Sequence, residues 1–264
     1  MGKSFLAFVL LESPASPDMV ALAAALRARH PELAAKVNDS GAAGSRRSSA
    51  NASVIRCGDR TIAVMSMPAP IPQDAGLWSR SVTAWPEAEA VAARHRGHLI
   101  VSVLGQNQQL LPNARLLTAT IGALIATMPE CCAVVWGDKI ARPADLWLHQ
   151  STQSYAPFPD HPSGLWVDVL PFRSGRGIGA VTIGLTAFVG REIEFETSRL
   201  TLAALIEKVD GLAVYLIEHG PVLKDGDTFG GDAHERIAVR YKNSDRFGSM
   251  PVFFCTDGPS SRND

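Results

Sequence analysis

The clearest hydrophobic pattern in the chain lies in its last third. Apolar residues recur at spacings of three and four from Leu202 to Ile217, so they share one face of a helix. Gly220 suits the left-handed position just beyond a helix end, and Pro221 cannot continue a helix. The pattern therefore predicts a long amphipathic helix that packs on a core and ends at Gly220.

Shorter patterns predict the remaining elements. Runs rich in Val, Ile and aromatic residues predict strands at 5–11, 53–57, 61–67, 98–104, 132–136, 165–170, 178–185, 236–241 and 252–255. Helical spacing predicts helices at 17–29, 86–94, 110–128 and 143–149. For the first of these helices we expect Ser16 as the N-cap and Pro17 at the first position.

The order of these elements predicts the fold class. The first half reads βαββαβ, helix 110–128 follows, and the order from residue 132 is again βαββαβ. This order is typical of the ferredoxin-like fold. We therefore expect an α+β protein with two ferredoxin-like halves in tandem, at 1–128 and 129–264, with mostly antiparallel sheets and helices on one face of each.

The apolar run from Phe5 to Leu11 has two interpretations. It reaches the minimum length of the apolar part of a signal peptide, and it also fits a first buried strand. Glu12 follows the run at once, which favours the strand.

Composition excludes some functions and suggests a compartment. The chain has 264 residues, 46% of them hydrophobic, and a formal net charge of −1. There is no basic excess to neutralise phosphates, so we expect neither nucleic acid nor an anionic membrane as partner. The four cysteines form no C-x-x-C pair, which argues against structural zinc. Free cysteines are typical of a reducing cytosol, so we expect a cytoplasmic protein of undetermined oligomeric state.

The turn after the long helix is the first candidate binding site. A cation, two carboxylates and a hydroxyl converge there, from Lys224, Asp225, Asp227 and Thr228. A calcium loop is excluded, because Phe229 and Arg236 stand where that loop needs oxygen ligands. The simpler interpretation is a tight turn with solvated carboxylates.

Aromatic and acidic residues in predicted strands are the other candidates. Trp136 and Asp168 are candidate binding residues, although tryptophans at strand positions usually belong to a core. Glu192, Glu194 and Glu196 alternate along one strand face, so they form an acidic stripe that could dock a basic partner. Solvated carboxylates are the simpler interpretation of this stripe.

The sequence contains no recognised catalytic motif. It has no G-x-S-x-G elbow and no Walker lysine motif. His95 and His98 lie three residues apart, but Gly97 is expected to end the helix between them, which argues against a shared metal. We therefore expect no catalytic residue, cofactor or metal ligand.

Five segments carry a resemblance to a protein family. They are Met67–Pro72, His95–Val101, Trp136–Gly137, Thr182–Leu185 and Gly220–Gly230. With them the chain resembles an uncharacterised bacterial family, the domain of unknown function 4261. One departure is Val189, which separates Phe188 from Gly190 where the family has Gly directly after Phe. The resemblance implies a compact bacterial cytoplasmic protein and implies no reaction.

Two functional hypotheses remain. The first is a non-enzymatic protein-interaction, adaptor or immunity-type module, favoured by the missing catalytic motifs. The alternative is an enzyme or small-molecule binder with its site near the Lys224–Thr228 turn.

Overall fold

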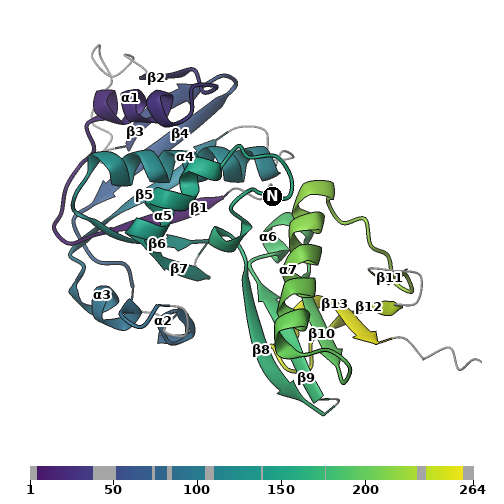
Figure 1. Cartoon of the computed structure of the whole chain (residues 1–264). Helices are drawn as coiled ribbons and strands as arrows, with labels where there is room; N and C mark the ends of the chain where they lie inside the picture. Colours follow the sequence, from purple (N-terminus) through teal and green to yellow (C-terminus); the bar gives the residue numbers. More distant parts are fainter. Residues whose placement is uncertain are drawn as a thin grey trace, which may run out of the picture. The chain divides into compact units, whose positions relative to one another are not determined.

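The computed structural model describes residues 5–37, 52–72, 75–81, 85–104, 110–137, 139–175, 177–230 and 236–257. Contacts divide the chain into two compact units, Met1–Leu165 and Trp166–Asp264, and each has its own sheet. Helices and mostly antiparallel strands occur in both units, so the predicted α+β class is confirmed (Figure 1).

The first unit is built on a seven-stranded sheet. Its strands are β1 (Leu6–Leu11), β2 (Ala35–Val37), β3 (Ala52–Cys57), β4 (Arg60–Met67), β5 (Gly97–Leu104), β6 (Cys131–Trp136) and β7 (Ile140–Pro143). Its helices are α1 (Met19–Arg29), α2 (Ala75–Ser81), α3 (Ala88–Arg94), α4 (Leu110–Thr127) and α5 (Ala144–Gln150). The strand order is β2-β3-β4-β5-β1-β6-β7, and neighbouring strands are antiparallel.

The run that resembles a signal peptide is the inner strand β1 of this sheet. It pairs with β5 on one side and β6 on the other. Ala7, Val9 and Leu10 are completely buried, because side chains on both faces of this inner strand are covered by helices. The strand predicted for residues 5–11 is therefore confirmed.

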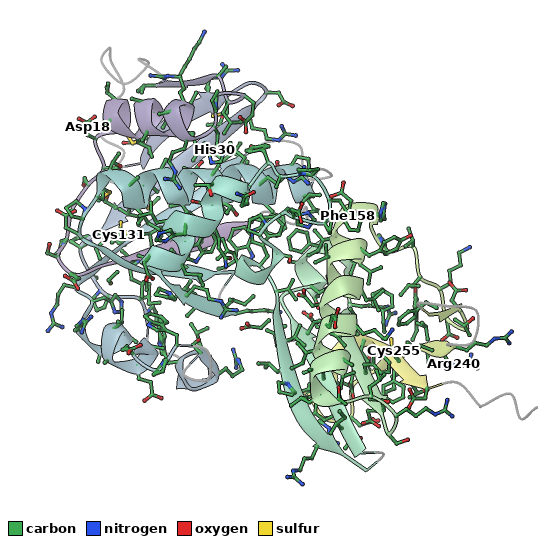
Figure 2. The ribbon with its side chains drawn as sticks, in the orientation of Figure 1. Asp18, His30, Cys131, Phe158, Arg240 and Cys255 are labelled. Atoms are coloured by element: carbon green, nitrogen blue, oxygen red, sulfur yellow. The ribbon has the colours of Figure 1, made fainter. Side chains whose placement is uncertain are left out.

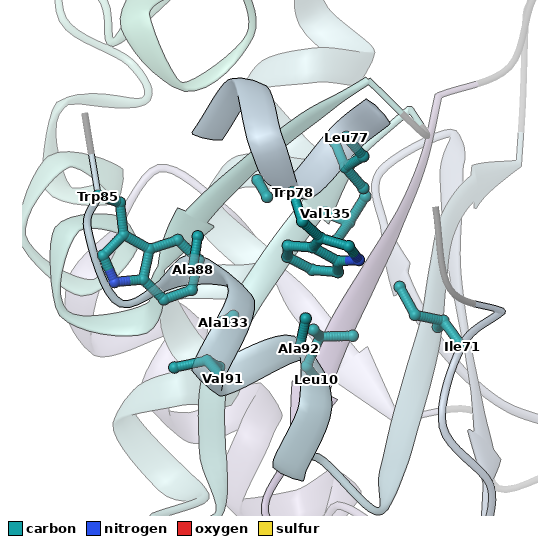
Figure 3. Packing of buried hydrophobic residues seen from close by; sticks show 11 residues of the cluster. Leu10, Ile71, Leu77, Trp78, Trp85, Ala88, Val91, Ala92, Ala133 and Val135 are labelled. Carbon is teal, nitrogen blue, oxygen red and sulfur yellow. The ribbon is translucent and has the colours of Figure 1, made fainter. Parts of the chain in front are cut away.

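Helices cover both faces of the first sheet. α1 packs beside α4 on one face, and α2 and α3 lie on the other (Figure 1). Under α2 and α3, the rings of Trp78 and Trp85 pack with Leu10 and Val135 of the sheet (Figure 3). By length and composition α4 could cross a membrane, but most of it is buried in the unit, as expected of a core helix.

Helix α1 begins two residues later than predicted. The N-cap is Asp18, which is labelled in Figure 2. Its Oδ1 accepts hydrogen bonds from the backbone N–H groups of Val20 (2.8 Å) and Ala21 (3.1 Å). The expectation of Ser16 as N-cap is wrong, because the Asp18 carboxylate satisfies two free N–H groups of the first turn.

The second unit is built on a six-stranded sheet. Its strands are β8 (Asp168–Ser174), β9 (Gly177–Ile183), β10 (Glu192–Thr197), β11 (Thr228–Phe229), β12 (Ile237–Asn243) and β13 (Pro251–Asp257). The strand order is β11-β12-β13-β10-β9-β8, in which β10 and β13 are parallel and all other neighbours antiparallel. Its helices are α6 (Thr186–Val189) and α7 (Leu202–His219).

Helix α7 confirms the strongest prediction from the sequence. Thr201 caps its first turn by accepting a hydrogen bond from Ala204 N at 3.3 Å. Gly220 ends it with a φ of 78°, which an L residue with a side chain rarely adopts. Leu205, Val209 and Leu216 are completely buried, so the helix covers one face of the second sheet.

The boundary between the units differs from the predicted one. The sequence places it after residue 128, whereas the structure places it after Leu165. The reason is strand β6, which pairs with β1 and carries β7 and α5 with it into the first unit. The second unit therefore lacks the opening β-α pair of the expected second half, and the tandem ferredoxin-like topology is not confirmed.

Candidate functional site

The second sheet has two different faces. Ile193, Phe195, Val239 and Cys255 are completely buried on the face beneath α7. Neighbouring positions along each strand point to the opposite face, because side chains alternate in a strand. Helix α7 contacts β8, β9 and β10 of this sheet, so the face opposite α7 carries the alternate positions of these strands.

A pocket lies on this second face. Its lining residues come from three strands and one turn: Glu194 and Glu196 of β10, Lys242 of β12, Phe254 of β13, and Asp245 and Arg246 of the turn after β12. The register places Glu194 beside Phe254 on the parallel strands β10 and β13. The cavity volume is about 470 Å³, which lies within the range of small-ligand sites.

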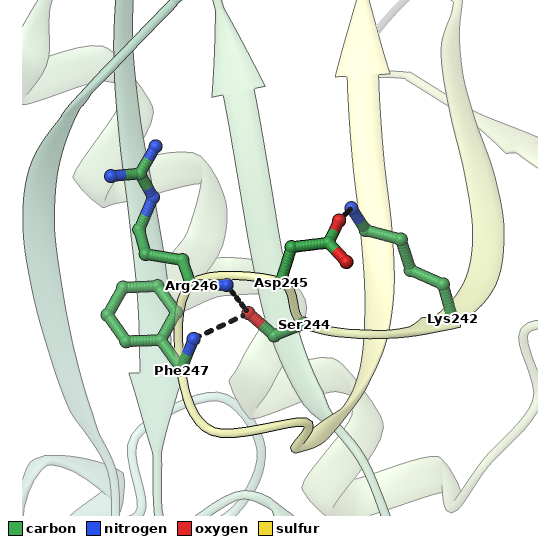
Figure 4. A network of polar contacts seen from close by, with 5 residues as sticks. All are labelled: Lys242, Ser244, Asp245, Arg246 and Phe247. Carbon is green, nitrogen blue, oxygen red and sulfur yellow. Dashed lines mark hydrogen bonds and ion pairs between the residues drawn. The ribbon is translucent and has the colours of Figure 1, made fainter.

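The turn between β12 and β13 forms one wall of the pocket. The side chain of Ser244 accepts hydrogen bonds from the backbone N–H groups of Arg246 (3.2 Å) and Phe247 (3.0 Å) (Figure 4). Ser244 N also donates to Met250 O at 2.8 Å, which closes the turn at its base. These bonds within the turn help to hold Asp245 and Arg246 beside the sheet.

The basic side chains of this site lie over aromatic rings. Lys242 Nζ lies 3.9 Å from the centroid of the Phe254 ring, and its ion pair with Asp245 measures 3.1 Å. The Arg246 guanidinium lies 4.7 Å from the centroid of the Phe172 ring. Cation–π contacts of this kind orient basic groups at a surface. The phenyl ring of Phe247 packs edge-on against Phe172.

The glutamates of β10 have contrasting environments. Glu192 is completely buried and its carboxylate accepts four hydrogen bonds. The donors are Thr182 Oγ1 (2.7 Å), Gly184 N (2.9 Å), Leu185 N (3.0 Å) and Thr186 N (3.0 Å). Glu194 is only 2% exposed, and its Oε2 has no hydrogen-bond partner. The solvated interpretation is therefore wrong for these two residues.

The Lys224–Thr228 turn is organised by its own side chains. Asp225 Oδ1 accepts a hydrogen bond from Tyr241 N at 2.7 Å, and Asp227 Oδ2 accepts one from Lys224 N at 2.8 Å. Thr228 begins the edge strand β11, which pairs with β12. Both carboxylates thus tie the turn to itself and to the sheet edge, and neither described pocket is lined by them.

The other two predicted site residues lie elsewhere. Trp136 belongs to the first unit, where its buried ring packs against Phe5 and Trp147 with centroid distances of 5.3 and 5.8 Å. It is a core residue. Asp168 begins β8 opposite Ile183 in the second unit and is half-buried. The structure therefore assembles neither residue into the pocket that Glu194 lines.

His95 and His98 contact the backbone of the proline-rich segment Met67–Pro72 in the first unit. His95 Nε2 accepts a hydrogen bond from Ile71 N at 2.9 Å, while its Nδ1 lies 2.6 Å from Ala92 O. His98 Nδ1 lies 2.7 Å from Ala69 O. No group of three metal-ligating side chains occurs within the described residues. The two histidines therefore have structural hydrogen-bonding roles.

This arrangement makes the first unit sensitive to acid. Burial lowers the pKa of His95, and the positive charges of His98 and Arg96 lower it further, against the opposing hydrogen bond to Ala92. The unfolded chain then takes up a proton near pH 6.5 that the folded chain does not, so stability falls as the pH falls through that value. We expect a lower melting temperature at pH 5.5 than at pH 7.5. His149→Gln, which changes an exposed histidine, should retain this difference, whereas His95→Gln should reduce it.

The cysteines do not form a reactive site. All four are free. Burial raises the pKa of the Cys57 and Cys132 thiols to about 11 and that of Cys131 to about 12. Thiolates are the reactive form of cysteine, so these thiols are inert at neutral pH.

A smaller pocket of about 280 Å³ lies in the first unit. Its lining residues are Gln150, Gln153, Asp160, His161, Pro162, Ser163 and Gly164. His161 is buried in this unit.

The fold and site together define a two-unit α+β protein with an open pocket on its second sheet. The matching family is a domain of unknown function, DUF4261, whose model covers residues 181–250. The resemblance inferred from the sequence is thus confirmed for this segment, which contains the Glu192 and Glu194 positions and the turn after β12. No curated protein and no solved structure matches the chain.

Proposed function

We propose that the protein is a non-enzymatic interaction module, and that its second unit binds a protein partner through the sheet face opposite α7. The observation that carries this proposal is the pocket lined by Glu194, Lys242 and Phe254 on the sheet face opposite α7. Arginine and aromatic residues are enriched at protein interfaces, and here both occur around one cavity.

Charge indicates the kind of partner. The pocket lining contains three carboxylates, from Glu194, Glu196 and Asp245, against two cationic groups, from Lys242 and Arg246. Asp245 already pairs with Lys242. The carboxylate of Glu194, whose Oε2 has no hydrogen-bond partner, favours a partner that presents a basic side chain.

The alternative, a ligand site at the Lys224–Thr228 turn, receives less support. A ligand there would have to displace the backbone N–H groups of Tyr241 and Lys224 from Asp225 and Asp227. The carboxylate of Glu194 needs no such displacement, because its Oε2 is unpartnered.

We also infer that the core of the first unit is ferredoxin-like. The strand order β6-β1-β5-β4, with neighbours antiparallel and α1 and α4 as the two crossover helices, supports this assignment. Free cysteines support a location in the reducing bacterial cytoplasm. Sheets of this kind host many functions, so the assignment of function depends on the pocket and not on the fold.

The test is affinity capture of the tagged full chain from lysate of its native host at low salt, comparing wild type with Glu194→Gln. A protein that wild type captures stoichiometrically and Glu194→Gln captures far less would support the proposed face, because Glu194 lines the pocket and the change removes the negative charge that attracts a basic partner. Glu207→Gln on the exposed side of α7 is the matched control and should retain the partner. A partner captured equally by wild type and Glu194→Gln would contradict docking at this face.

A further inference from the structure

The most informative group in the pocket is a carboxylate that has no partner. Glu194 is 2% exposed, it lines the cavity, and its Oε2 makes no hydrogen bond. Buried carboxylates are ordinarily paired or hydrogen-bonded, because leaving water without compensation is unfavourable. Glu192, two residues earlier on the same strand, follows this rule with four donors. Glu194 is therefore the exception that requires an explanation.

We infer that this pocket holds a monovalent organic cation, an alkylammonium or alkylguanidinium group, paired with the carboxylate of Glu194. This inference rests on the proposed function. The biological ligand would be a lysine or arginine side chain of the protein partner, because such a side chain carries an ammonium or guanidinium group. The aromatic wall of Phe254 suits the alkyl part of the cation.

The basic residues of the pocket do not fill this role themselves. Lys242 Nζ pairs with Asp245 at 3.1 Å (Figure 4) and lies over the Phe254 ring, so its interactions are made with residues other than Glu194. Arg246 lies over the Phe172 ring. Lys242 and Arg246 are thus engaged with other side chains of the site, and the buried carboxylate of Glu194 remains available to a ligand.

A metal ion fits this site less well than an organic cation. Within the described residues no three side chains of the His, Cys, Asp or Glu types converge to hold a metal. The cationic side chains of Lys242 and Arg246 in the lining repel a doubly charged metal ion more strongly than a singly charged organic cation. A single positive charge, in contrast, matches a single unpartnered carboxylate.

The first test needs no ligand. An unpaired buried charge destabilises the folded protein, so Glu194→Met, which replaces it by an apolar side chain of similar length, should raise the melting temperature by about 4 °C or more. A lower melting temperature would contradict the inference, because it would mean that the carboxylate already has a stabilising partner within the protein.

The second test uses defined model cations on the full chain. N-acetyl-lysine methylamide and N-acetyl-arginine methylamide are titrated, with N-acetyl-norleucine methylamide as the uncharged match, and backbone amide resonances are followed by NMR. We expect saturable shifts at Glu194 and Phe254, with dissociation constants roughly in the millimolar range for ligands this small. Glu194→Gln should weaken binding about tenfold or more, since it removes the charge and retains the shape. The lysine and arginine arms distinguish ammonium from guanidinium.

Three outcomes would contradict the inference. They are equal shifts with the norleucine compound, shifts that survive in Glu194→Met, and no saturable shift in wild type. Binding that appears only in Lys242→Met would also contradict it, because Lys242 would then occupy the site in the free protein. These readouts require no partner, so they separate a failure of this inference from a failure of the proposed interaction function.

Discussion

Glu192→Ala is expected to destabilise the second unit by about 3–5 kcal/mol, because it removes a buried carboxylate that organises four donors. Thr182 Oγ1 and the backbone N–H groups of Gly184, Leu185 and Thr186 would lose their common acceptor. The measurement is the free energy of unfolding from urea denaturation, followed by circular dichroism.

The neighbouring glutamate supplies the control for this prediction. Glu194→Met lies two positions away on the same strand and should increase stability, whereas Glu192→Ala should decrease it. Changes of the same sign at both positions would contradict the assignment of Glu192 to structure and Glu194 to binding. Opposite signs would be difficult to explain by strand propensity alone, since both residues occupy β10.

Leu216→Asp should unfold the second unit, with a loss of more than about 4 kcal/mol, because it places an unpaired charge in the core beneath α7. Leu216 is completely buried on this helix. A unit of about 100 residues has only roughly 5–15 kcal/mol of stability, so a loss of this size leaves little margin. Loss of cooperative unfolding and increased proteolysis of the region 166–257 are the expected observations.

Leu202→Asp is the matched change on the same helix. Leu202 is 45% exposed and begins α7, where an acidic residue interacts favourably with the helix dipole. We expect this variant to fold with wild-type stability. A cooperatively folded Leu216→Asp protein, or an unfolded Leu202→Asp protein, would show that α7 packs on the sheet through a different face.

Glu192 and Glu194 have different roles in our proposal, the first in stability and the second in binding. Glu192 stabilises the start of α6, and three of its four donors come from the Thr182–Leu185 segment that carries part of the family resemblance. Glu194 destabilises the free protein, in our proposal, until a cation arrives. Binding sites commonly retain such unfavourable groups, because removing them improves stability and removes function.

Much of the fold was predictable because it depends on local patterns. The spacing from Leu202 to Ile217 determined a helix with one buried face, and Gly220 determined its end. The run from Phe5 to Leu11 determined a buried strand, although only pairing with β5 and β6 revealed that it is an inner one. The position of the unit boundary was missed, because the partner of strand β6 lies more than 100 residues earlier and leaves no local signal.

The candidate site was only partly predictable, for a related reason. The alternation of Glu192, Glu194 and Glu196 identified the strand face, since side chains alternate with a period of two. Burial, however, is a property of what covers a position, so the sequence could not distinguish the four-fold bonded Glu192 from the unpartnered Glu194. Lys242, Arg246 and Phe254 were not recognised, because they approach β10 only through the β12–β13 turn and the parallel β10–β13 pairing.

The sequence by itself thus determined the α+β class, the long helix, the central strand and the acidic face of β10. Each depends on residues close together in the chain, where periodicity and steric preference act. The tertiary structure alone decided which strand joins which sheet, which carboxylate finds donors, and which residues surround the pocket. Those outcomes depend on pairing between distant segments, and the free energy of a buried charge depends on neighbours that only such pairing supplies.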